Sequence, residues 1–351
     1  MVNRLTFLER ILHRLHLLPT PIMDTFAGVL FGRVLAIAVR RGLFDALASG
    51  PMNAAEIAAV THFHPRALAL VLNSCVVAGY LAQRGEMYQL SAEGRRWLCK
   101  ESPDSLVNLV AYFETLYVRW ANLENSLERG GPPRPYYEAF NEDDWRIYSL
   151  GMKELARILL PRVIETITPD KEARSLLDIG GSHGLYAIEC CRRRPHLHAT
   201  VMDFAPALAL ASNFARESGV AGRVELLAGN FLTDPLPPAQ DVVLMFNIIH
   251  GLSDAENRTL LARALAALRP GGKLFILDQM RQNGKSSSPI AQFIPLMVGL
   301  NLLNEIGGSV YSTEEITEWC NGYTVRQLKL RLPGVALIEV SSRQKNQNSA
   351  V

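Results

Sequence analysis

The stretch Leu177-Asp178-Ile179-Gly180-Gly181-Ser182-His183-Gly184 decides the fold of this chain. It joins an apolar segment, Ser175–Ile179, that has the length of a strand to a segment, Leu185–Arg194, that has the pattern of a helix. Glycines at such a turn let the backbone bend sharply and approach a ligand beside the N-terminus of the helix. The stretch therefore predicts a ligand-binding loop between a strand and a helix.

The spacing of the glycines argues against a dinucleotide-binding loop. The pattern G-x-G-x-x-G, started at Gly180, would need glycines at Ser182 and Leu185, and it fails in the same way when it is started at Gly181. Asp178, directly before the glycines, would also repel a pyrophosphate. A carboxylate at this position suits a cationic ligand, such as an amino group or a sulfonium.

From Ser175 onward the sequence alternates short apolar strands with helices. After the first strand we expect strands at Ala199–Met202, Val224–Leu227, Asp241–Asn247 and Lys273–Leu277, with a turn at Arg269-Pro270-Gly271-Gly272. This alternation predicts a parallel sheet with helices on both faces. Two last strands, Thr324–Leu330 and Val335–Val340, flank Leu332-Pro333-Gly334 and predict an antiparallel pair. The predicted fold class is α/β, with a Rossmann-like sheet and an antiparallel terminal hairpin, which resembles the class I methyltransferase sheet.

Polar residues follow two further strands of the predicted sheet. Asp203 lies 25 residues after Asp178, at the end of the next strand, where a carboxylate can accept hydrogen bonds from both ribose hydroxyls of an adenosine. Gly229-Asn230-Phe231 follows the third strand. Because ligands of such sheets bind beyond the carboxyl ends of the strands, we expect Asn230 to bond the amino edge of an adenine and Phe231 to pack on its ring.

Length, charge and cysteine content narrow the class of protein. The 351 residues favour two domains, and the net charge of +2 includes no basic block that would indicate a nucleic-acid partner. The five cysteines show neither metal-ligand spacing nor an even disulfide framework, which favours a reduced, cytoplasmic compartment. Arginines at 33, 40 and 41 interrupt the apolar stretch from Phe26 to Phe44, so we expect an amphipathic helix against another surface and no membrane span.

The first 100 residues have the pattern of helices joined by short turns. Asn53, with Glu56 three residues later, predicts a capping box at the start of the helix Ala54–Val60. A second helix, Pro65–Ala78, is followed by a small β-hairpin, and this order is typical of a winged helix. The second helix carries one formal charge, Arg66, which favours a packing role over DNA recognition.

In their order, these residues resemble the motifs of the plant-type family of S-adenosylmethionine-dependent small-molecule O-methyltransferases, which includes bacterial and hydroxyneurosporene-type members. Asp178 to Gly184 resembles the glycine motif, Asp203 the acidic residue, and His250 to Asp254 the segment that holds the catalytic histidine. The likeness to the family's dimerisation domain rests on Arg41-Gly42-Leu43-Phe44-Asp45, Ala55-Glu56-Ile57-Ala58 and Gly79-Tyr80-Leu81.

The resemblance implies three regions and a set of site residues. Residues 1–100 would be a winged-helix dimerisation domain that forms a homodimer, 101–168 a helical linker and pocket roof, and 169–351 the Rossmann-like catalytic domain. The cofactor would be S-adenosyl-L-methionine, bound by Asp178, Gly180, Gly181, Asp203, Phe204, Asn230, Phe231, Phe246 and Asn247. His250 would be the general base, oriented by Asp278, and no metal is expected.

The methyl acceptor would bind among helices before and after the cofactor loop. The candidate pocket residues are Met152, Phe293, Met297, Leu300, Asn301 and Asn304. Phe293, Met297 and Leu300 recur at helical spacing, and such a stripe suits either a core or a pocket. An apolar pocket indicates an aromatic or isoprenoid-like acceptor, whose orientation the two asparagines could fix.

The chain departs from the family pattern at several positions. Ser182 replaces a glycine, Asn230 an aspartate, Gly251-Leu252 an Asp-Trp pair, and Asp278 an orienting glutamate. A second glutamate has no counterpart, because Val310 or Tyr311 stands at its place and Glu305 is offset. Beside O-methylation, these departures leave open C-methylation on the same fold and a repurposed decarboxylase, cyclase or hydroxylase that keeps the cofactor.

Overall fold

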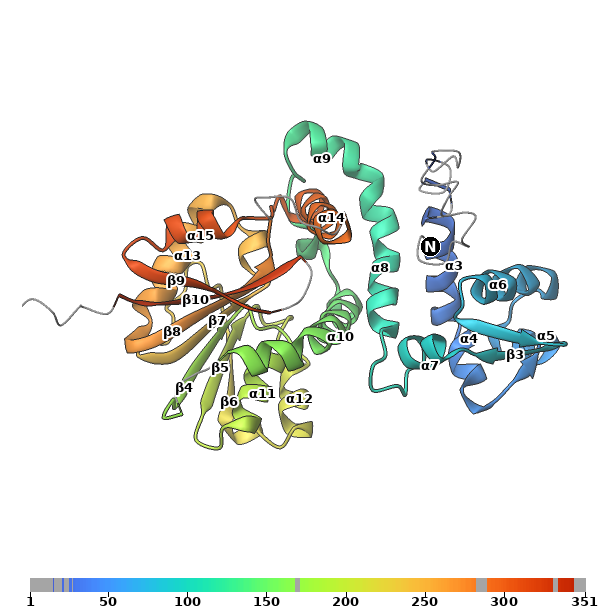
Figure 1. The fold of residues 1–351 in the computed structure, drawn as a ribbon, viewed down its shortest axis with the longest axis horizontal. Coiled ribbons are helices and arrows are strands. Elements are labelled where there is room, and N and C mark those ends of the chain that lie inside the picture. The colour runs from blue at the N-terminus through green and yellow to red at the C-terminus, as the bar shows by residue number, and fades with distance from the viewer. Residues whose placement is uncertain are drawn as a thin grey trace, which may run out of the picture. The chain divides into compact units, whose positions relative to one another are not determined.

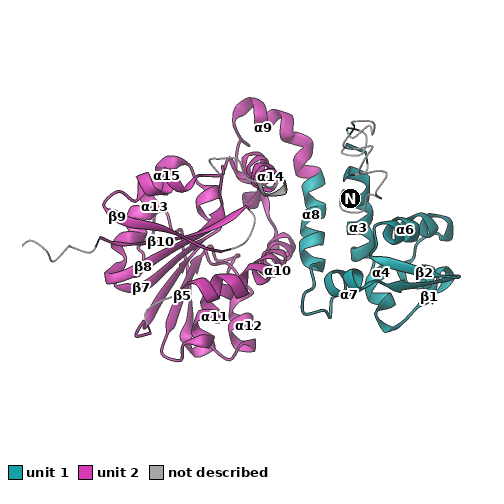
Figure 2. Cartoon of the chain, viewed as in Figure 1, with its two compact units in different colours: residues 1–117 teal, residues 118–351 magenta. Residues whose placement is uncertain are grey.

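The structure is a computed structural model that describes residues 15, 21, 25–26, 28–167, 171–281, 289–330 and 334–343. The chain divides into two compact units, unit 1 (residues 1–117) and unit 2 (residues 118–351), which Figure 2 shows in teal and magenta. Their boundary falls inside the segment 101–168, and the limits of the three regions drawn from the sequence stay predictions.

Unit 1 consists of helices around a small antiparallel sheet. Along the chain its elements are α3 (Gly28–Arg40), α4 (Leu43–Ala46), η3 (Leu47–Ser49), β1 (Met52–Asn53), α5 (Ala54–Thr61), α6 (Pro65–Val77), β2 (Leu81–Arg84), β3 (Met87–Leu90), α7 (Ala92–Leu98) and α8 (Val107–Arg119), which ends in unit 2. Because β3 pairs with both neighbours, the strand order is β1-β3-β2. This arrangement confirms the predicted, mainly helical N-terminal domain.

The predicted capping box at the start of α5 is present. The Asn53 side chain accepts the backbone N–H of Glu56 at 3.0 Å, and the Glu56 carboxylate accepts the N–H of Asn53 at 2.8 Å. One turn further along α5, Ile57 is buried with Leu43 and Phe44 in the core of the unit. The local signal for the start of the helix and the burial of its apolar face therefore agree.

Unit 2 is a seven-stranded sheet with helices on both faces (Figure 1). Its strands are β4 (Ser175–Ile179), β5 (His198–Asp203), β6 (Val224–Ala228), β7 (Gln240–Phe246), β8 (Leu268–Gln279), β9 (Tyr323–Leu328) and β10 (Val335–Ser342). The order is β6-β5-β4-β7-β8-β10-β9, with β4 to β8 parallel and β10 antiparallel to β8 and β9. The predicted α/β fold with antiparallel last strands is confirmed, while the turn at Leu332-Pro333 lies outside the described residues.

Helices cover two separate cores on the faces of this sheet. After α8, the helices of unit 2 are η4 (Trp120–Asn122), α9 (Leu123–Arg129), η5 (Tyr136–Ala139), α10 (Glu142–Thr166), α11 (Leu185–Arg193), α12 (Ala211–Glu217), η6 (Ala221–Arg223), η7 (Ile249–Gly251), α13 (Asp254–Ala266), α14 (Pro289–Ile306) and α15 (Thr313–Trp319). Leu176 and Leu244 pack with α10, α11 and α12, whereas Leu177 and Val243 pack with α13 and α15. Because both faces of the central strands are buried, polar chemistry is confined to the strand ends.

One strand differs from the sequence prediction. β8 begins at Leu268, so Arg269-Pro270-Gly271-Gly272, expected as a turn, belongs to the strand. The register between β7 and β8 shifts between Gln240 and Val242, which marks an irregularity of the bulge type. A bulge accommodates proline and glycine that would otherwise end a strand, which is why the turn signal was wrong here.

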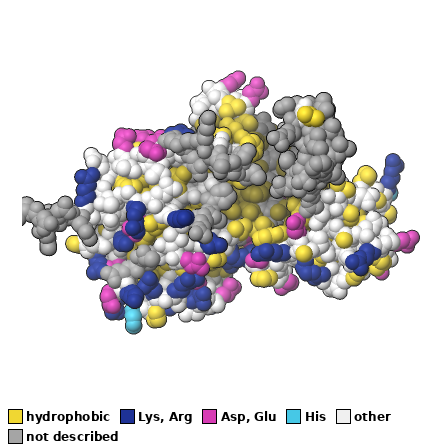
Figure 3. Space-filling view, in the orientation of Figure 1, with side chains coloured by type: hydrophobic (Ala, Val, Ile, Leu, Met, Phe, Trp, Pro, Cys, Tyr) yellow, Lys and Arg dark blue, Asp and Glu magenta, His cyan; other side chains and the backbone are white. Residues whose placement is uncertain are grey.

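The helices and surface of the described residues bear on possible partners. No helix in these ranges is long and apolar enough to cross a membrane. Each of the five cysteines lies in these ranges and is a buried, free thiol. On the face of unit 2 that Figure 3 shows, basic and acidic side chains are interspersed.

We expect Gly94→Ala to destabilise unit 1. A Cβ atom at Gly94, inside α7, would overlap the carbonyl oxygen of Tyr80, which accepts hydrogen bonds from both the N–H and the hydroxyl of Ser91 at 3.0 Å. Relieving this overlap must move backbone, and overpacking of this kind costs about 1–3 kcal/mol. Urea denaturation should reveal the loss. Gly222→Ala is the control, because its Cβ would meet no atom within 4 Å, and equal stability of the two variants would contradict this packing.

Candidate active site

The glycine loop turns the chain from β4 into α11. Gly180 and Gly184 adopt the left-handed region, with φ of 67° and 68°. A side chain at Gly180 would overlap Ile248, and a Cβ atom at Gly181 would lie 2.7 Å from the carboxyl carbon of Asp178. The loop therefore requires glycine at these positions, both for its dihedral angles and for the close approach of its backbone to neighbouring groups.

Ser182 adopts an unusual conformation in the same loop. Its φ is 43°, where a glycine would meet no steric penalty. The N–H of Ser182 donates a hydrogen bond to Oδ2 of Asp203 at 2.9 Å, and its hydroxyl lies 3.5 Å from the carbonyl oxygen of Ala207. These contacts hold the residue in place, so the loop keeps its shape although the family's glycine is replaced.

Two buried carboxylates lie at the carboxyl ends of neighbouring strands beside this loop. Asp178, in β4, is 1% exposed, and Asp203, which ends β5, is also buried. Asp203 accepts the N–H groups of Ser182 and Phe204 at 2.9 and 2.7 Å, which orients both of its oxygens. Oδ2 of Asp178 has no hydrogen-bond partner among the described residues. This edge of the sheet thus holds one oriented carboxylate and one buried oxygen still without a donor.

Burial raises the pKa of both carboxyl groups. Desolvation, and then the negative charge of Asp203, raise the pKa of Asp178 to about 8. Desolvation raises the pKa of Asp203 to about 6, against hydrogen bonds from Phe204 and Ser182 that lower it. A cation between the two groups would favour both ionised forms, so the pair suits a positively charged ligand.

Phe204 and Phe231 lie together beside the glycine loop. Their ring centroids are 6.2 Å apart, and a Cβ atom placed on Gly180 would lie 3.6 Å from the ring of Phe231. The side-chain oxygen of Asn230 accepts the N–H of Leu232 at 3.0 Å. The structure therefore brings the predicted aromatic pair to the loop, while the Asn230 oxygen is already engaged in its own turn.

Phe246 and Asn247 follow each other at the end of β7. Phe246 is buried in the core with α10 and α11, where its ring meets that of Tyr186 edge to face, with centroids 4.8 Å apart. Asn247 has φ of 56°, and its N–H donates to the carbonyl oxygen of Leu277 at 2.7 Å. The Phe246 side chain thus belongs to the core, whereas Asn247 lies at the sheet edge where β4 and β5 also end.

His250 and Asp278 form the second polar centre of this edge. Asp278, near the end of β8, is 0% exposed, and its Oδ1 lies 2.6 Å from Nδ1 of His250. Its Oδ2 accepts the backbone N–H of His250 at 3.3 Å. The contact favours the tautomer with the proton on Nδ1, which leaves the Nε2 lone pair as an acceptor. No described residue bonds Nε2.

The two asparagines predicted for the acceptor pocket belong to a buried cluster that joins the end of α8 and η4 to α14. Nε of Arg119 lies 2.5 Å from Oε1 of Glu305, which also receives the Asn301 amide at 3.3 Å on its other oxygen. Asn301 accepts the indole N–H of Trp120 at 2.7 Å, and Asn304 donates to the carbonyl oxygen of Arg119 at 3.2 Å. Glu305 is therefore engaged by Arg119, and the sequence analysis missed this pair because 186 residues separate its members.

The other predicted pocket residues are partly exposed, and His183 is held in the structure. Phe293 is 60% exposed on α14, while Met297 and Leu300 on that helix and Met152 on α10 are half-buried.

Burial lowers the pKa of His183 to about 4, and the carbonyl oxygen of Met152 accepts a hydrogen bond from its ring. His183 is thus neutral and structural. Within the described ranges, no group of three or more His, Cys, Asp or Glu residues could hold a metal ion.

These groups fit a nucleoside that carries a positive charge. The unpartnered oxygen of Asp178 suits an ammonium group, and the oriented oxygens of Asp203 suit ribose hydroxyls. A Rossmann-like sheet with an antiparallel last strand and this edge defines a class I, S-adenosylmethionine-dependent methyltransferase.

Comparison with known proteins identifies the family. The chain belongs to the S-adenosylmethionine-dependent O-methyltransferase family, whose methyltransferase domain matches residues 123–323 and whose dimerisation domain matches residues 23–100. It is 28% identical over 330 residues to the 3-hydroxy-5-methyl-1-naphthoate 3-O-methyltransferase of Streptomyces sahachiroi, covering 90% of this chain and 93% of that protein.

A second relative and a solved structure support the same family. The chain is 33% identical over 270 residues to the N,N-dimethyltransferase OxyT of Streptomyces rimosus, covering 71% of this chain and 74% of that protein. Its fold matches that of human N-acetylserotonin methyltransferase in complex with SAM, with a TM-score of 0.81 and 21% identity over 93% of this chain and 98% of that chain.

Binding of S-adenosylmethionine should release protons from the carboxylate pair. With a pKa of about 8 for Asp178 and about 6 for Asp203, each carboxyl group becomes protonated below its own value in the empty protein. A cation favours the ionised forms, so affinity should rise with pH from about 5 until the ligand's own amino group loses its proton. Titration calorimetry in buffers of different ionisation enthalpy measures the protons released.

Asp178→Asn, which keeps the shape and removes the charge, is the matched control. It should bind the cofactor at least about tenfold more weakly at alkaline pH, a loss of about 1.4 kcal/mol. Its cofactor affinity should also lose the higher-pH part of the rise, because that part comes from ionisation of Asp178. Titration of the ligand's own amino group affects both proteins equally, so it cancels when their pH profiles are compared. A pH dependence equal to that of the wild type would contradict the role given to Asp178.

Proposed function

We propose that this chain methylates a hydroxyl group of a flat, largely apolar small molecule, with His250 as the general base and Asp278 as the residue that orients it. The 2.6 Å contact between Nδ1 of His250 and the buried carboxylate of Asp278 carries the proposal. An imidazole held in this way presents Nε2 to an acceptor hydroxyl and becomes a stabilised cation when it takes the proton.

The residues of the chain then have separate roles in binding and proton transfer. S-adenosylmethionine, when bound, supplies an electrophilic methyl group on a sulfonium. Asp178 holds its amino end, Asp203 its ribose, and Phe204 and Phe231 pack on its adenine. His250 accepts the hydroxyl proton at Nε2, a general-base contribution of about 10²- to 10⁴-fold, and Asp278 stabilises the imidazolium.

Several observations support an aromatic hydroxyl as the acceptor. Phe293, Met297 and Leu300 offer an apolar, partly exposed stripe on α14. α14 also contacts η7, which carries His250. The relative from Streptomyces sahachiroi is named for methylation of a hydroxynaphthoate, which is a flat molecule of this kind. We assign Asn304 as a polar contact, because its Oδ1 is buried and has no partner among the described residues.

His250→Ala should reduce methylation to a residual rate and leave cofactor binding intact. With hydroxynaphthoates as probe acceptors, formation of S-adenosylhomocysteine should fall about 10²- to 10⁴-fold, because the hydroxyl proton has no acceptor. Asp278→Asn should lose at least about 10²-fold, since it favours the wrong tautomer. The cofactor Kd of both variants, measured by calorimetry, should stay within a factor of two or so.

His198→Ala is the matched control, because this exposed histidine begins β5 at the opposite edge of the sheet. It should keep wild-type turnover. If His250→Ala also turned over normally, His250 would not be the base. Mass spectrometry of the product locates the methyl group on oxygen or carbon. Product formed without S-adenosylhomocysteine would instead support a repurposed, non-methylating enzyme.

We propose further that unit 1 forms a homodimer. The dimerisation domain matched at residues 23–100 supports this, as do apolar side chains exposed on α3 (Val29 and Leu30) and on α6 (Leu70 and Val77). Light scattering at micromolar concentration should give twice the 38.9 kDa of one chain. A monomeric mass under these conditions would contradict the proposal.

A further inference from the structure

We infer that Asn257 is a positioning residue for His250, acting together with Tyr311 through the backbone of residues 249–252, which we call the His250 loop. The inference rests on the proposed function, because it gives His250 the role of base. Asn257 touches neither the imidazole nor the sheet edge where ligands bind. It binds the chain on both sides of the histidine instead.

The contacts of Asn257 span the loop. This residue lies in the second turn of α13 and is 0% exposed. Its Nδ2 donates to the carbonyl oxygen of Ile249 at 2.9 Å and lies 3.3 Å from that of Leu252. One amide group therefore holds the residue before His250 and the second residue after it, and ties both to a helix.

The α13 helix itself does not require asparagine at position 257. Alanine is the better helix former, and a fully buried amide must be satisfied to avoid a desolvation penalty. Oδ1 of Asn257 has no partner among the described residues, so the side chain is retained with half of its hydrogen-bonding capacity unused. The part that is used is the donor that faces the His250 loop.

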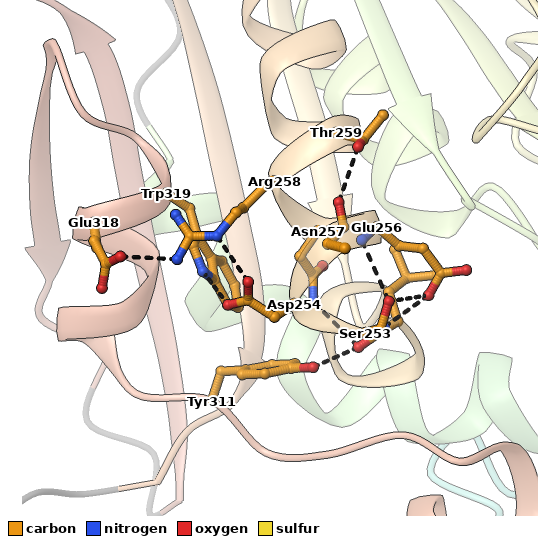
Figure 4. A network of polar contacts seen from close by, with 11 residues as sticks. Ser253, Asp254, Glu256, Asn257, Arg258, Thr259, Tyr311, Glu318 and Trp319 are labelled. Atoms are coloured by element: carbon orange, nitrogen blue, oxygen red, sulfur yellow. Dashed lines mark hydrogen bonds and ion pairs between the residues drawn. The ribbon is translucent and has the colours of Figure 1, made fainter.

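Tyr311 supports the same loop beside Asn257, whose side chain its hydroxyl contacts. Its hydroxyl donates to the carbonyl oxygen of Leu252 at 2.5 Å, and its ring meets that of Trp319 edge to face, with centroids 4.8 Å apart. The indole N–H of Trp319 donates to Asp254 at 2.7 Å, and Asp254 pairs with Arg258 at 2.7 Å (Figure 4). The carbonyl oxygen of Leu252 is thus shared by two rigidly held donors.

These contacts matter because the loop has little stiffness of its own. It is a single 3-10 turn, Ile249–Gly251, that contains a glycine. The imidazole is fixed at Nδ1 by Asp278, and the carbonyl oxygen of His250 accepts the N–H of Ser309 at 2.9 Å. With Asn257 in place, the backbone under the ring is held as well, and Nε2 keeps one position. A displacement of about 1 Å in a catalytic group can cost about 10²-fold in rate.

Three variants test the inference. Asn257→Ala removes the donor, and Asn257→Asp keeps the shape but sets a carboxylate against two carbonyl oxygens. Both should lower kcat by about 10- to 100-fold and leave the cofactor Kd unchanged. Tyr311→Phe keeps the packing on Trp319 and should lose less, because Asn257 still holds the loop. The acid limb of the kcat–pH profile should also shift in the Asn257 variants, since a displaced imidazole bonds Asp278 differently.

Asp241→Ala is the control that separates an effect on the position of His250 from an effect on the stability of the fold. Asp241 is buried at the start of β7 and accepts the N–H groups of Arg174 and Ser175 at 2.7 and 2.9 Å, at the edge of the sheet away from His250. Asp241→Ala should destabilise the fold but keep the wild-type kcat and pH profile. If this variant lost kcat and shifted its profile like the Asn257 variants, the inference would be overturned, because loss of stability would explain both.

A double-mutant cycle distinguishes failure of the inference from failure of the proposed function. If His250→Ala is active, the base assignment fails. If His250→Ala keeps only a residual rate while both Asn257 variants and Tyr311→Phe keep the wild-type kcat and pH profile, only the inference fails. If Asn257 acts through the histidine, Asn257→Ala should cause no further loss in the His250→Ala background. Full additivity of the two losses would overturn the positioning role.

Discussion

The burial of two carboxyl groups at one edge of a parallel sheet is the constraint on which this structure depends. Asp178 and Asp203 end neighbouring strands, and desolvation opposes ionisation of both. A fold that keeps such a pair is stabilised by a cationic ligand rather than by the pair itself. The strand order places β7 and β8 beside them, so Asn247 and Asp278 reach the same edge. The carboxylate pair and the His250–Asp278 pair are thereby carried by one sheet.

Much of this arrangement was predictable because its signals are local in sequence. Alternating strands and helices indicated the sheet, the Asn53 and Glu56 pair indicated a helix start, and carboxylates at strand ends indicated the ligand edge. Contacts between distant segments carry no such signal. The ion pair of Arg119 with Glu305 and the hold of Asn257 on the loop depend on how helices pack. The predicted turn at residues 269–272 was wrong because a bulge tolerates a Pro-Gly-Gly stretch that usually ends a strand.

The histidine in this chain depends on a single carboxylate. Among the described residues, Asp278 is the one acidic group bonded to His250. Val310 and Tyr311, one of which stands where the resemblance sets a second glutamate, are both buried, and the nearby Glu305 is occupied by Arg119. Asp278 binds His250 with both of its oxygens: Oδ1 contacts Nδ1 of the ring, and Oδ2 accepts the backbone N–H. A shorter side chain than glutamate is sufficient because η7 lies directly against β8.

The His250 loop is bound through its main chain. Besides the imidazole, which Asp278 contacts, the groups that neighbouring residues hold are the carbonyl oxygens of Ile249, His250 and Leu252 and the N–H of His250. Side chains at 251 and 252 contribute none of these hydrogen bonds. These hydrogen bonds therefore do not depend on which side chains stand at 251 and 252, and the loop keeps them although Gly251-Leu252 replaces the family's Asp-Trp pair. A search that scores relatives by the letters after the histidine would underrate chains such as this one, whereas the partners of the backbone groups would still identify them.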